Sequence, residues 1–172
     1  MTDETLARDI AAVATLTGAF LLRSGQTSST YFDKYRFESN PELLKRVAKK
    51  MVPLLPHRAD VLAGLELGGV PIATAISLDT GMPAAFVRKK AKNYGTCLAV
   101  EGADVASKRV VLIEDVITTG GAIVEAVKLV EAAGGNVVGI VCAIWRGDGA
   151  PGIASLPDLT VAAAMTKDDL LA

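Results

Sequence analysis

The chain has 172 residues, of which 51% are hydrophobic and 22% are charged, and its net charge is -1 at pH 7. The length suits one domain, and the apolar content excludes a disordered chain. Because basic and acidic residues almost cancel, no overall basic field favours nucleic acid, and any anion site has to be built locally.

Two cysteines and one histidine exclude a disulfide framework and argue against a zinc site of ordinary composition. No apolar run reaches the roughly 18 residues that a membrane span needs. Acidic residues occupy the N-terminus, where a signal peptide would carry basic ones. We therefore expect a soluble, cytoplasmic protein that acts without a membrane or a nucleic acid as partner.

The first predicted elements are one helix and two short strands. Apolar residues recur at helical spacing over 3–16, and we expect Gly18 to end this helix. The runs 20–22 and 31–33 are typical of strands, because a turn-like segment rich in serine and glycine separates them.

A second helix is predicted to start at Asn40, a capping residue, with Pro41 in the first helical position, and to end at Pro56. Strands and helices then alternate. The predicted strands span 61–64, 84–87, 110–113, 137–144 and 159–163, and the helices between them span 71–77 and 121–133. This order predicts an α/β fold in a single domain over residues 1–172, with a central, mainly parallel sheet flanked by helices.

About twenty residues without a clear period separate the strand ending at Val87 from the strand starting at Val110, and loops that long are usually functional lids or disordered segments. The segment opens with the run Arg-Lys-Lys-Ala-Lys at 88–92, which concentrates positive charge. A solvated charged loop is the other interpretation of such a run.

The segment 110–122 joins a buried strand to a helix, which is where ligands bind in open α/β sheets. Thr118, Thr119, Gly120 and Gly121 are small, so several backbone N–H groups can point at one phosphate. The following helix adds its positive N-terminal end. These residues predict a cradle for a phosphate group.

Glu114 and Asp115 precede this cradle. A carboxylate repels phosphate, but it accepts hydrogen bonds from hydroxyl groups or holds a metal through water. A cradle for one phosphate beside acceptors for two hydroxyls indicates a ribose 5-phosphate. Neither a Walker loop nor a GxGxxG motif occurs. The other interpretation is a plain strand–turn–helix with acidic capping.

The segment 110–121 has four apolar residues, two acids, two apolar residues and Thr-Thr-Gly-Gly. It resembles the phosphoribosyl pyrophosphate (PRPP) motif of type I phosphoribosyltransferases. Segments 18–33, 64–73 and 88–95 are similar to the N-terminal hood, the pyrophosphate loop and the mobile catalytic loop of the orotate branch of that family. The resemblance implies the type I phosphoribosyltransferase fold. In it, about 1–40 and the C-terminal segment form a small hood, and about 88–108 form the catalytic loop.

The resemblance implies transfer of the phosphoribosyl group of PRPP to N1 of orotate, giving orotidine 5′-monophosphate and pyrophosphate in the synthesis of UMP. The implied catalytic residues are Arg88, Lys92, Glu114 and Asp115. The implied PRPP contacts are Gly68, Gly69, Arg88, Lys89, Lys92, Tyr94, Glu114, Asp115, Val116, Ile117, Thr118, Thr119, Gly120, Gly121 and Ala122. Magnesium is expected to be held mainly by PRPP, and Glu114 and Asp115 are the protein groups expected to reach it.

The implied orotate contacts are Arg23, Tyr31, Phe32, Thr118 and Arg146. In the family the catalytic loop reaches the neighbouring subunit's site, so the resemblance implies a homodimer.

Four positions depart from the family pattern. Arg23 stands where lysine is usual, Gly68 where some relatives have lysine, and Tyr94 where histidine is frequent. Lys90 matches a position that is often acidic, so no contact is assigned to it.

Two other functions are compatible with parts of the chain. A phosphoribosyltransferase for a purine or for uracil would share residues 114–122 but differ in the hood and at Arg146. A non-catalytic regulator that senses PRPP would need a basic face or an added segment to bind nucleic acid, and the balanced charge argues against it. Cys142 and His57 are interpreted as a core residue and a surface residue, and nothing near Cys97 marks it as a nucleophile.

Overall fold

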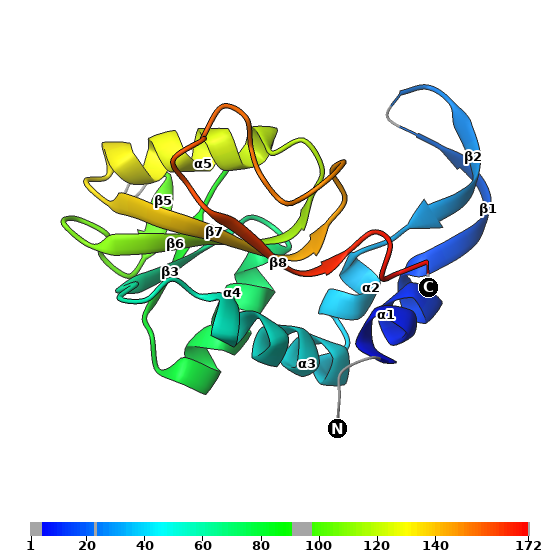
Figure 1. Cartoon of the computed structure of the whole chain (residues 1–172), viewed down its shortest axis with the longest axis horizontal. Helices are drawn as coiled ribbons and strands as arrows, with labels where there is room; N and C mark the ends of the chain where they lie inside the picture. The colour runs from blue at the N-terminus through cyan, green and yellow to red at the C-terminus, as the bar shows by residue number, and fades with distance from the viewer. Residues whose placement is uncertain (1–4, 23, 91–97, 172) are drawn as a thin grey trace.

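The computed structural model describes residues 5–22, 24–90 and 98–171. A six-stranded sheet forms its centre (Figure 1), with the strand order β5-β4-β3-β6-β7-β8. The strands are β3 (Val61–Leu65), β4 (Ala84–Val87), β5 (Val100–Gly102), β6 (Arg109–Ile117), β7 (Asn136–Trp145) and β8 (Val161–Thr166). Neighbouring strands pair in parallel, except that the edge strand β5 pairs antiparallel with β4. The predicted α/β fold with a mainly parallel sheet is confirmed.

Helices cover both faces of this sheet. The helices α3 (Pro41–Met51) and α4 (Gly69–Thr80) lie on one face, and α5 (Gly121–Ala132) lies on the other (Figure 1). Along β6, Val110 and Leu112 pack in the cluster that contains the buried side chains of α5, whereas Val111 and Ile113 pack in the cluster of α3 and α4. Successive strand residues point to opposite faces. Consecutive residues at the end of β6 therefore meet different surroundings.

The N-terminal segment forms a small unit beside the sheet, which we call the hood (Figure 1). It consists of α1 (Leu6–Ala14), β1 (Thr15–Leu21), β2 (Thr27–Phe32) and the short helix α2 (Tyr35–Glu38). The strands β1 and β2 pair antiparallel in a sheet of their own. Leu170 and Leu171, near the C-terminus, line a pocket together with residues of β1 and β2. The C-terminal residues therefore lie beside the hood.

The structure corrects the predicted end of the first helix. The helix stops at Ala14 rather than at Gly18, and β1 begins at Thr15. Thr15 and Thr17 pair with Phe32 and Thr30 of β2. Branching at Cβ favours the strand, and the partners that complete it lie too far along the chain for a local hydrophobic period to reveal them.

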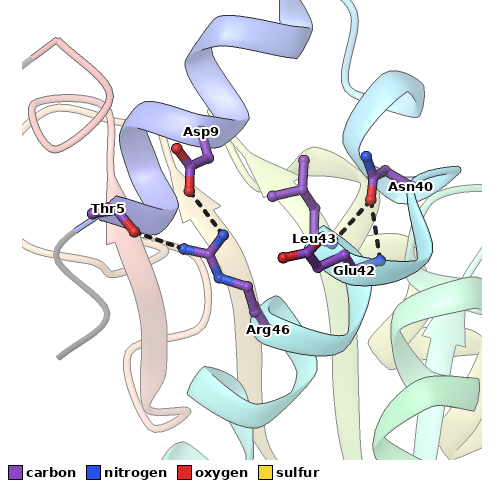
Figure 2. Close-up of polar contacts among 6 residues, drawn as sticks. All are labelled: Thr5, Asp9, Asn40, Glu42, Leu43 and Arg46. Carbon is purple, nitrogen blue, oxygen red and sulfur yellow. Dashed lines mark hydrogen bonds and ion pairs between the residues drawn. The ribbon is translucent and has the colours of Figure 1, made fainter. Parts of the chain in front are cut away.

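The second helix starts where the sequence predicts it. The side chain of Asn40 accepts hydrogen bonds from the backbone N–H groups of Glu42 and Leu43 at 3.1 and 3.2 Å (Figure 2). Its predicted end at Pro56 is wrong, because α3 ends at Met51 and a 3₁₀ turn follows over Val52–Leu54. Pro53 lies in that turn, and proline lacks the N–H that would continue an α-helix.

An ion pair joins α1 to α3 at the outer side of the hood. The guanidinium group of Arg46 donates to the carboxylate of Asp9 at 2.8 Å and to the hydroxyl of Thr5 at 3.0 Å (Figure 2). Thr5 and Asp9 belong to the start of α1 and Arg46 belongs to α3, so these contacts help to fix how the two helices pack. It lies outside the pockets described below.

The short strand β5 lies inside the span 88–108, for which the sequence analysis predicted no strand. Its residues pair with β4 from Ala85 to Val87, and the backbone N–H of Arg88 donates to the carbonyl of Ala99 at 2.8 Å. The start of the basic run is thereby anchored at the sheet edge. Among the residues that the structure describes, no helix is both long and apolar enough to cross a membrane.

Candidate active site

The loop between β6 and α5 surrounds a pocket with small residues and the start of a helix. Thr118 and Thr119 are exposed, and Gly120 adopts a φ of 79° as the residue that precedes α5. A Cβ at Gly120 would lie 2.7 Å from Cδ1 of Ile153, so a larger residue has neither the conformation nor the space. The pocket has a volume of about 360 Å³ and is lined by Glu114 and residues 116–123. We call it the phosphate pocket.

Glu114 lies at the inner wall of the phosphate pocket. It is 8% exposed, and its Oε1 accepts a hydrogen bond from the backbone N–H of Asp115 at 3.0 Å. Burial, and then the hydrogen bond with the Asp115 side chain, raise the pKa of the Glu114 carboxyl to about 9. The side chain can therefore act as a hydrogen-bond donor or acceptor at the edge of this pocket.

Asp115 follows Glu114 but is fully buried, with 0% of its surface exposed. Its Oδ1 accepts from the backbone N–H of Val116 at 2.6 Å, and its Oδ2 lies 2.6 Å from the ammonium nitrogen of Lys34. Burial by itself would raise the pKa of Asp115, but its hydrogen bonds with Glu114, Glu38 and Lys34 together lower it. The structure therefore holds Asp115 as a buried carboxylate that is paired with a cation from the hood.

A further carboxyl group from the hood joins this arrangement. Glu38, at the end of α2, is 6% exposed, and its Oε1 packs against Gly68 beside Oδ2 of Asp115. Burial is the main cause that raises the pKa of Glu38 to about 9, and the contact with Asp115 adds to it. We call Lys34, Glu38, Glu114 and Asp115 the carboxyl cluster.

The turn that precedes α4 closes over the carboxyl cluster. A Cβ at Gly68 would collide with Oδ2 of Asp115 and would lie 2.7 Å from Oε1 of Glu38. Gly69, the first residue of α4, packs so closely on the backbone carbonyl of Ile113 that it has no room for a Cβ either. Both glycines are buried against β6. Their small size thus lets the predicted pyrophosphate loop approach the end of the central strand.

The first basic residues of the predicted catalytic loop lie beside the phosphate pocket. Arg88 and Lys89 line a pocket of about 310 Å³ with Glu66 and with Gly121 and Ala122 at the start of α5. The backbone N–H of Lys89 donates to Oε1 of Glu66 at 2.5 Å, which ties the loop to the turn after β3. This pocket and the phosphate pocket share Gly121 and Ala122, so they are neighbours.

A larger pocket opens between the hood and the end of β7. Tyr31 and Phe32 of β2 and Arg146 line it together, and its volume is about 470 Å³. The guanidinium carbon of Arg146 lies 5.2 Å from the centroid of the Phe32 ring. The backbone N–H of Arg146 donates to the carbonyl of Ile117 at 2.8 Å, which places this residue beside the loop that starts at Thr118. We call this space the base pocket.

The structure thus groups most of the predicted site residues at one edge of the sheet. Thr118 lines the phosphate pocket and does not line the base pocket. The predicted residues Arg23, Lys92 and Tyr94 lie outside the described residues.

The sequence analysis missed three residues at this edge. Lys34 and Glu38 belong to the carboxyl cluster, and Lys167 lines the base pocket. A basic residue directly after the last strand was a signal for Lys167, because parallel strands end at the same edge. Nothing in the local pattern points to Lys34 or Glu38.

Comparison with known proteins identifies the family of this chain. Residues 36–156 match the phosphoribosyl transferase domain family. An orotate phosphoribosyltransferase from Nocardioides sp. is 57% identical over 168 residues, which cover 98% of this chain and 94% of the relative. Another, from Methanopyrus kandleri, is 38% identical over 171 residues, covering 99% and 92% of the two chains.

Solved structures with a similar fold come from the same family. The orotate phosphoribosyltransferase of Mycobacterium tuberculosis, crystallised with PRPP, aligns with a TM-score of 0.81 at 28% identity and covers 98% of each chain. The UMP synthase of Leishmania donovani aligns with a TM-score of 0.82 at 32% identity, over 99% of this chain and 38% of that protein. From the matched domain, the sequence identity and the shared fold together, the chain belongs to the orotate phosphoribosyltransferase family.

Proposed function

We propose that this chain transfers the phosphoribosyl group of PRPP to N1 of orotate and releases pyrophosphate. The observation that carries the proposal is the hydrogen bond from the Arg146 backbone to Ile117, at 2.8 Å. It brings the base pocket and the phosphate pocket to one edge of the sheet, so a base and a ribose phosphate can be held next to each other. The product, orotidine 5′-monophosphate, is the precursor of UMP.

The phosphate pocket is the proposed site of the ribose 5-phosphate. Backbone N–H groups of residues 118–122 and the start of α5 provide donors and a positive dipole end for the phosphate. Glu114, at the wall of the same pocket, is placed to bond a ribose hydroxyl. Asp115 is the second predicted partner of the hydroxyls, and it is fully buried next to Lys34.

The base pocket is the proposed site of orotate. Arginine offers a planar fork of donors, which suits the carboxylate and carbonyl groups of this base. Phe32 and Tyr31 provide apolar surface for the flat ring, and Arg146 supplies positive charge, while the ammonium group of Lys167 is paired with Asp148 at 2.7 Å. A neutral pyrimidine such as uracil lacks the carboxylate and so gains less from this charge.

The chemical step moves negative charge onto pyrophosphate. The bond between C1′ and the pyrophosphate oxygen breaks, the leaving group takes the electron pair, and N1 of orotate forms the new bond to C1′ as its proton is lost to water. Arg88 and Lys89, beside the start of α5, are positioned to stabilise this charge, and Lys92 is the third predicted cation. Cations placed in advance stabilise the transition state more than the ground state.

Magnesium is the proposed metal. Among the described residues, no three His, Cys, Asp or Glu side chains form a group that could hold a metal ion. Mg²⁺ commonly uses one or two carboxylates together with substrate phosphates and water. Glu114, at the wall of the phosphate pocket, is the carboxyl group that would reach it, whereas Asp115, the other predicted one, is fully buried and paired with Lys34. When bound, the ion would neutralise charge on the pyrophosphate oxygens.

The proposed active unit is a homodimer in which Lys92 and Tyr94 of the catalytic loop serve the other subunit's site, whereas Arg88 and Lys89, predicted to do the same, line a pocket of their own chain. Mixing two inactive variants tests this directly. In a hybrid dimer of Lys92→Ala with Arg146→Ala, one complete site forms if the loop acts across the interface, and none forms if it acts within its own chain. Recovery of activity on mixing supports the proposal, and the absence of recovery in a verified hybrid contradicts it.

A spectrophotometric assay tests the reaction itself. The absorbance of orotate is followed after addition of PRPP and Mg²⁺, with hypoxanthine, guanine and uracil tested in parallel by product analysis. We expect consumption of orotate, with release of pyrophosphate in equal amount, and far slower reaction of the other bases. Faster turnover of a purine or of uracil would contradict the proposal. We further propose a cytoplasmic location, which cell fractionation tests.

A further inference from the structure

The carboxyl cluster contains a cation from outside the phosphoribosyl motif. Lys34 lies between β2 and α2, just after Phe32 of the base pocket, and its ammonium nitrogen is 2.6 Å from Oδ2 of Asp115. The backbone N–H of the intervening Asp33 donates to the carbonyl of Ala14 at 2.8 Å, which anchors this segment to α1. A single short segment of the hood therefore connects the base pocket to the second acid of the motif.

The surroundings of Asp115 make this cation necessary. Asp115 has no exposed surface, and two further carboxyl groups lie next to it. Oε1 of Glu38 packs against Gly68 beside Oδ2 of Asp115, and Oε1 of Glu114 accepts from the Asp115 backbone N–H at 3.0 Å. A buried carboxylate without a cation is costly, and removing one partner of such a pair commonly changes the geometry or the charge of the other. Lys34 supplies the opposite charge in this cluster.

The orientation of Asp115 is also restricted on its other sides. Its Oδ1 accepts from the backbone of Val116, and Gly68 packs directly against its Oδ2. Oδ2 therefore faces the pyrophosphate turn, Glu38 and Lys34 at once. A shift of the Lys34 ammonium group would leave this oxygen between a closely packed backbone and a neighbouring carboxyl group.

We propose that Lys34 is a positioning residue of the reaction, whose ammonium group holds the carboxylate of Asp115 in its place at the base of the ribose-phosphate site. Lys34 acts through Asp115. The hood then has two roles: it forms a wall of the base pocket, and it positions a residue of the ribose-phosphate site. The inference rests on the proposed function, in which Asp115 contributes to binding the ribose.

The test is a double-mutant cycle with Lys34→Met, Asp115→Asn and the combination of both. Losing a hydrogen bond between charged groups costs a factor of ~10 to 100, so we expect Lys34→Met to lower kcat by that factor at saturating PRPP. The KM for orotate should change by less than about twofold, because Lys34 does not line the base pocket. In the Asp115→Asn background, Lys34→Met should lower kcat by less than about twofold, because its target is already neutral.

Arg46→Met is the matched control. Like Lys34, Arg46 is a cation paired with a carboxylate: its Nη1 lies 2.8 Å from Oδ2 of Asp9 (Figure 2). This pair lies outside the three pockets. Thermal melts of all variants show that each is folded at the assay temperature. We expect Arg46→Met to lower the melting temperature and to leave kcat unchanged.

Restoring the ammonium group provides a second measurement. The Lys34 side chain is 33% exposed, so a cysteine at this position can be reached by 2-bromoethylamine, which rebuilds a lysine-like side chain. Activity should return on treatment of Lys34→Cys and stay unchanged in treated wild-type protein. Lys34→Gln replaces Lys34→Met in the cycle if the methionine variant does not fold.

Two results would overturn the inference while leaving the proposed function intact. One is a wild-type kcat for folded Lys34→Met. The other is an equal loss from Lys34→Met in the wild-type and Asp115→Asn backgrounds, which would mean that Lys34 does not act through Asp115. A wild-type kcat for Asp115→Asn alone would overturn both this inference and the proposed role of Asp115.

Discussion

The guanidinium group of Arg146 lies over the ring of Phe32, with 5.2 Å between its central carbon and the ring centroid. Phe32 ends the second strand of the hood, and Arg146 follows the longest strand of the central sheet. A cation over an aromatic face is an attractive contact. It joins the two parts of the molecule that form the base pocket and leaves the guanidinium donors available to a flat anion.

The shape of the guanidinium group leads to a first prediction. Arg146→Lys keeps the charge but loses the planar fork, so kcat/KM for orotate should fall by ~10 to 100-fold, while the KM for PRPP stays within about twofold. Arg109→Lys is the control. Arg109 starts β6 at the opposite end of the strand and forms its ion pair with Asp60 there. Steady-state rates with each substrate varied distinguish the two variants, and equal losses in both would contradict the assignment.

The glycine before α5 gives a second prediction. In Gly120→Ala the new Cβ would lie 2.7 Å from Ile153, at a φ that non-glycine residues rarely adopt, so the loop has to shift. We expect the KM for PRPP to rise about tenfold or more, because the amides of this loop are the proposed phosphate donors. PRPP titration of initial rates measures the effect.

Gly134→Ala is the comparison for that variant. Gly134 has a φ of 83°, but a Cβ there would find its nearest neighbour at 3.5 Å, which is ordinary contact. We expect this variant to lose roughly 1–2 kcal/mol of unfolding free energy from the left-handed backbone and to keep its KM for PRPP. An unchanged KM in Gly120→Ala, or an equal rise in both variants, would show that the loop around Gly120 does not bind PRPP.

Cys142 provides a third prediction, about reactivity. It is fully buried in β7, and burial, followed by the nearby Glu114 and Asp115, raises the pKa of its thiol to about 12. Because the thiolate is the reactive form, iodoacetamide at pH 8 should leave Cys142 unmodified in the native protein and modify it after denaturation. Peptide mapping by mass spectrometry locates the label. Native modification of Cys142 at the rate of the denatured chain would contradict its placement in the core.

The ion pair between Asp60 and Arg109 gives a fourth prediction, about pH. Asp60 accepts from the backbone N–H, the Nε and the Nη2 of Arg109 at 2.9, 2.9 and 2.7 Å. The side-chain hydrogen bonds, and then the backbone one, hold the pKa of Asp60 well below its ordinary value of 3.8. A carboxyl group with a lowered pKa stabilises the folded state above its ordinary pKa, and that contribution is lost as the pH falls toward the lowered value.

Asp60→Asn measures this contribution. The variant should melt below the wild type at pH 7, and the difference in melting temperature should shrink as the pH falls below about 4, because Asp60 of the unfolded wild-type chain then binds a proton and the unfolded state gains stability. Thermal unfolding of both proteins across this range gives the comparison. A difference that stays constant or grows at acidic pH would contradict the lowered pKa.

The features that the sequence predicted correctly are local ones. The string from Glu114 to Gly121 indicated a strand, a phosphate loop and a helix start, because a phosphate cradle consists of consecutive backbone amides at one turn. Asn40 likewise identified its helix start, because a cap bonds to amides two and three residues ahead. Alternation of apolar strands and helices was sufficient for the fold class, since burial on both faces needs continuous apolar strands.

The features that the sequence did not reveal depend on distant partners. The first part of β1, from Thr15 to Thr17, was predicted as helix because its pairing with β2 becomes visible only once the hairpin has formed. The helix α2 is too short for a periodic pattern to identify it.

By itself, the sequence determined the phosphate loop, the acids before it and the family to which they belong, because these depend on neighbouring residues. The tertiary structure decided that Asp115 is fully buried against Lys34 and Glu38 while Glu114 lines the pocket. It also decided that Arg146 stands over Phe32. Strand register and the packing of the hood set these contacts, and no local stretch of residues encodes a distance between two elements that fold together.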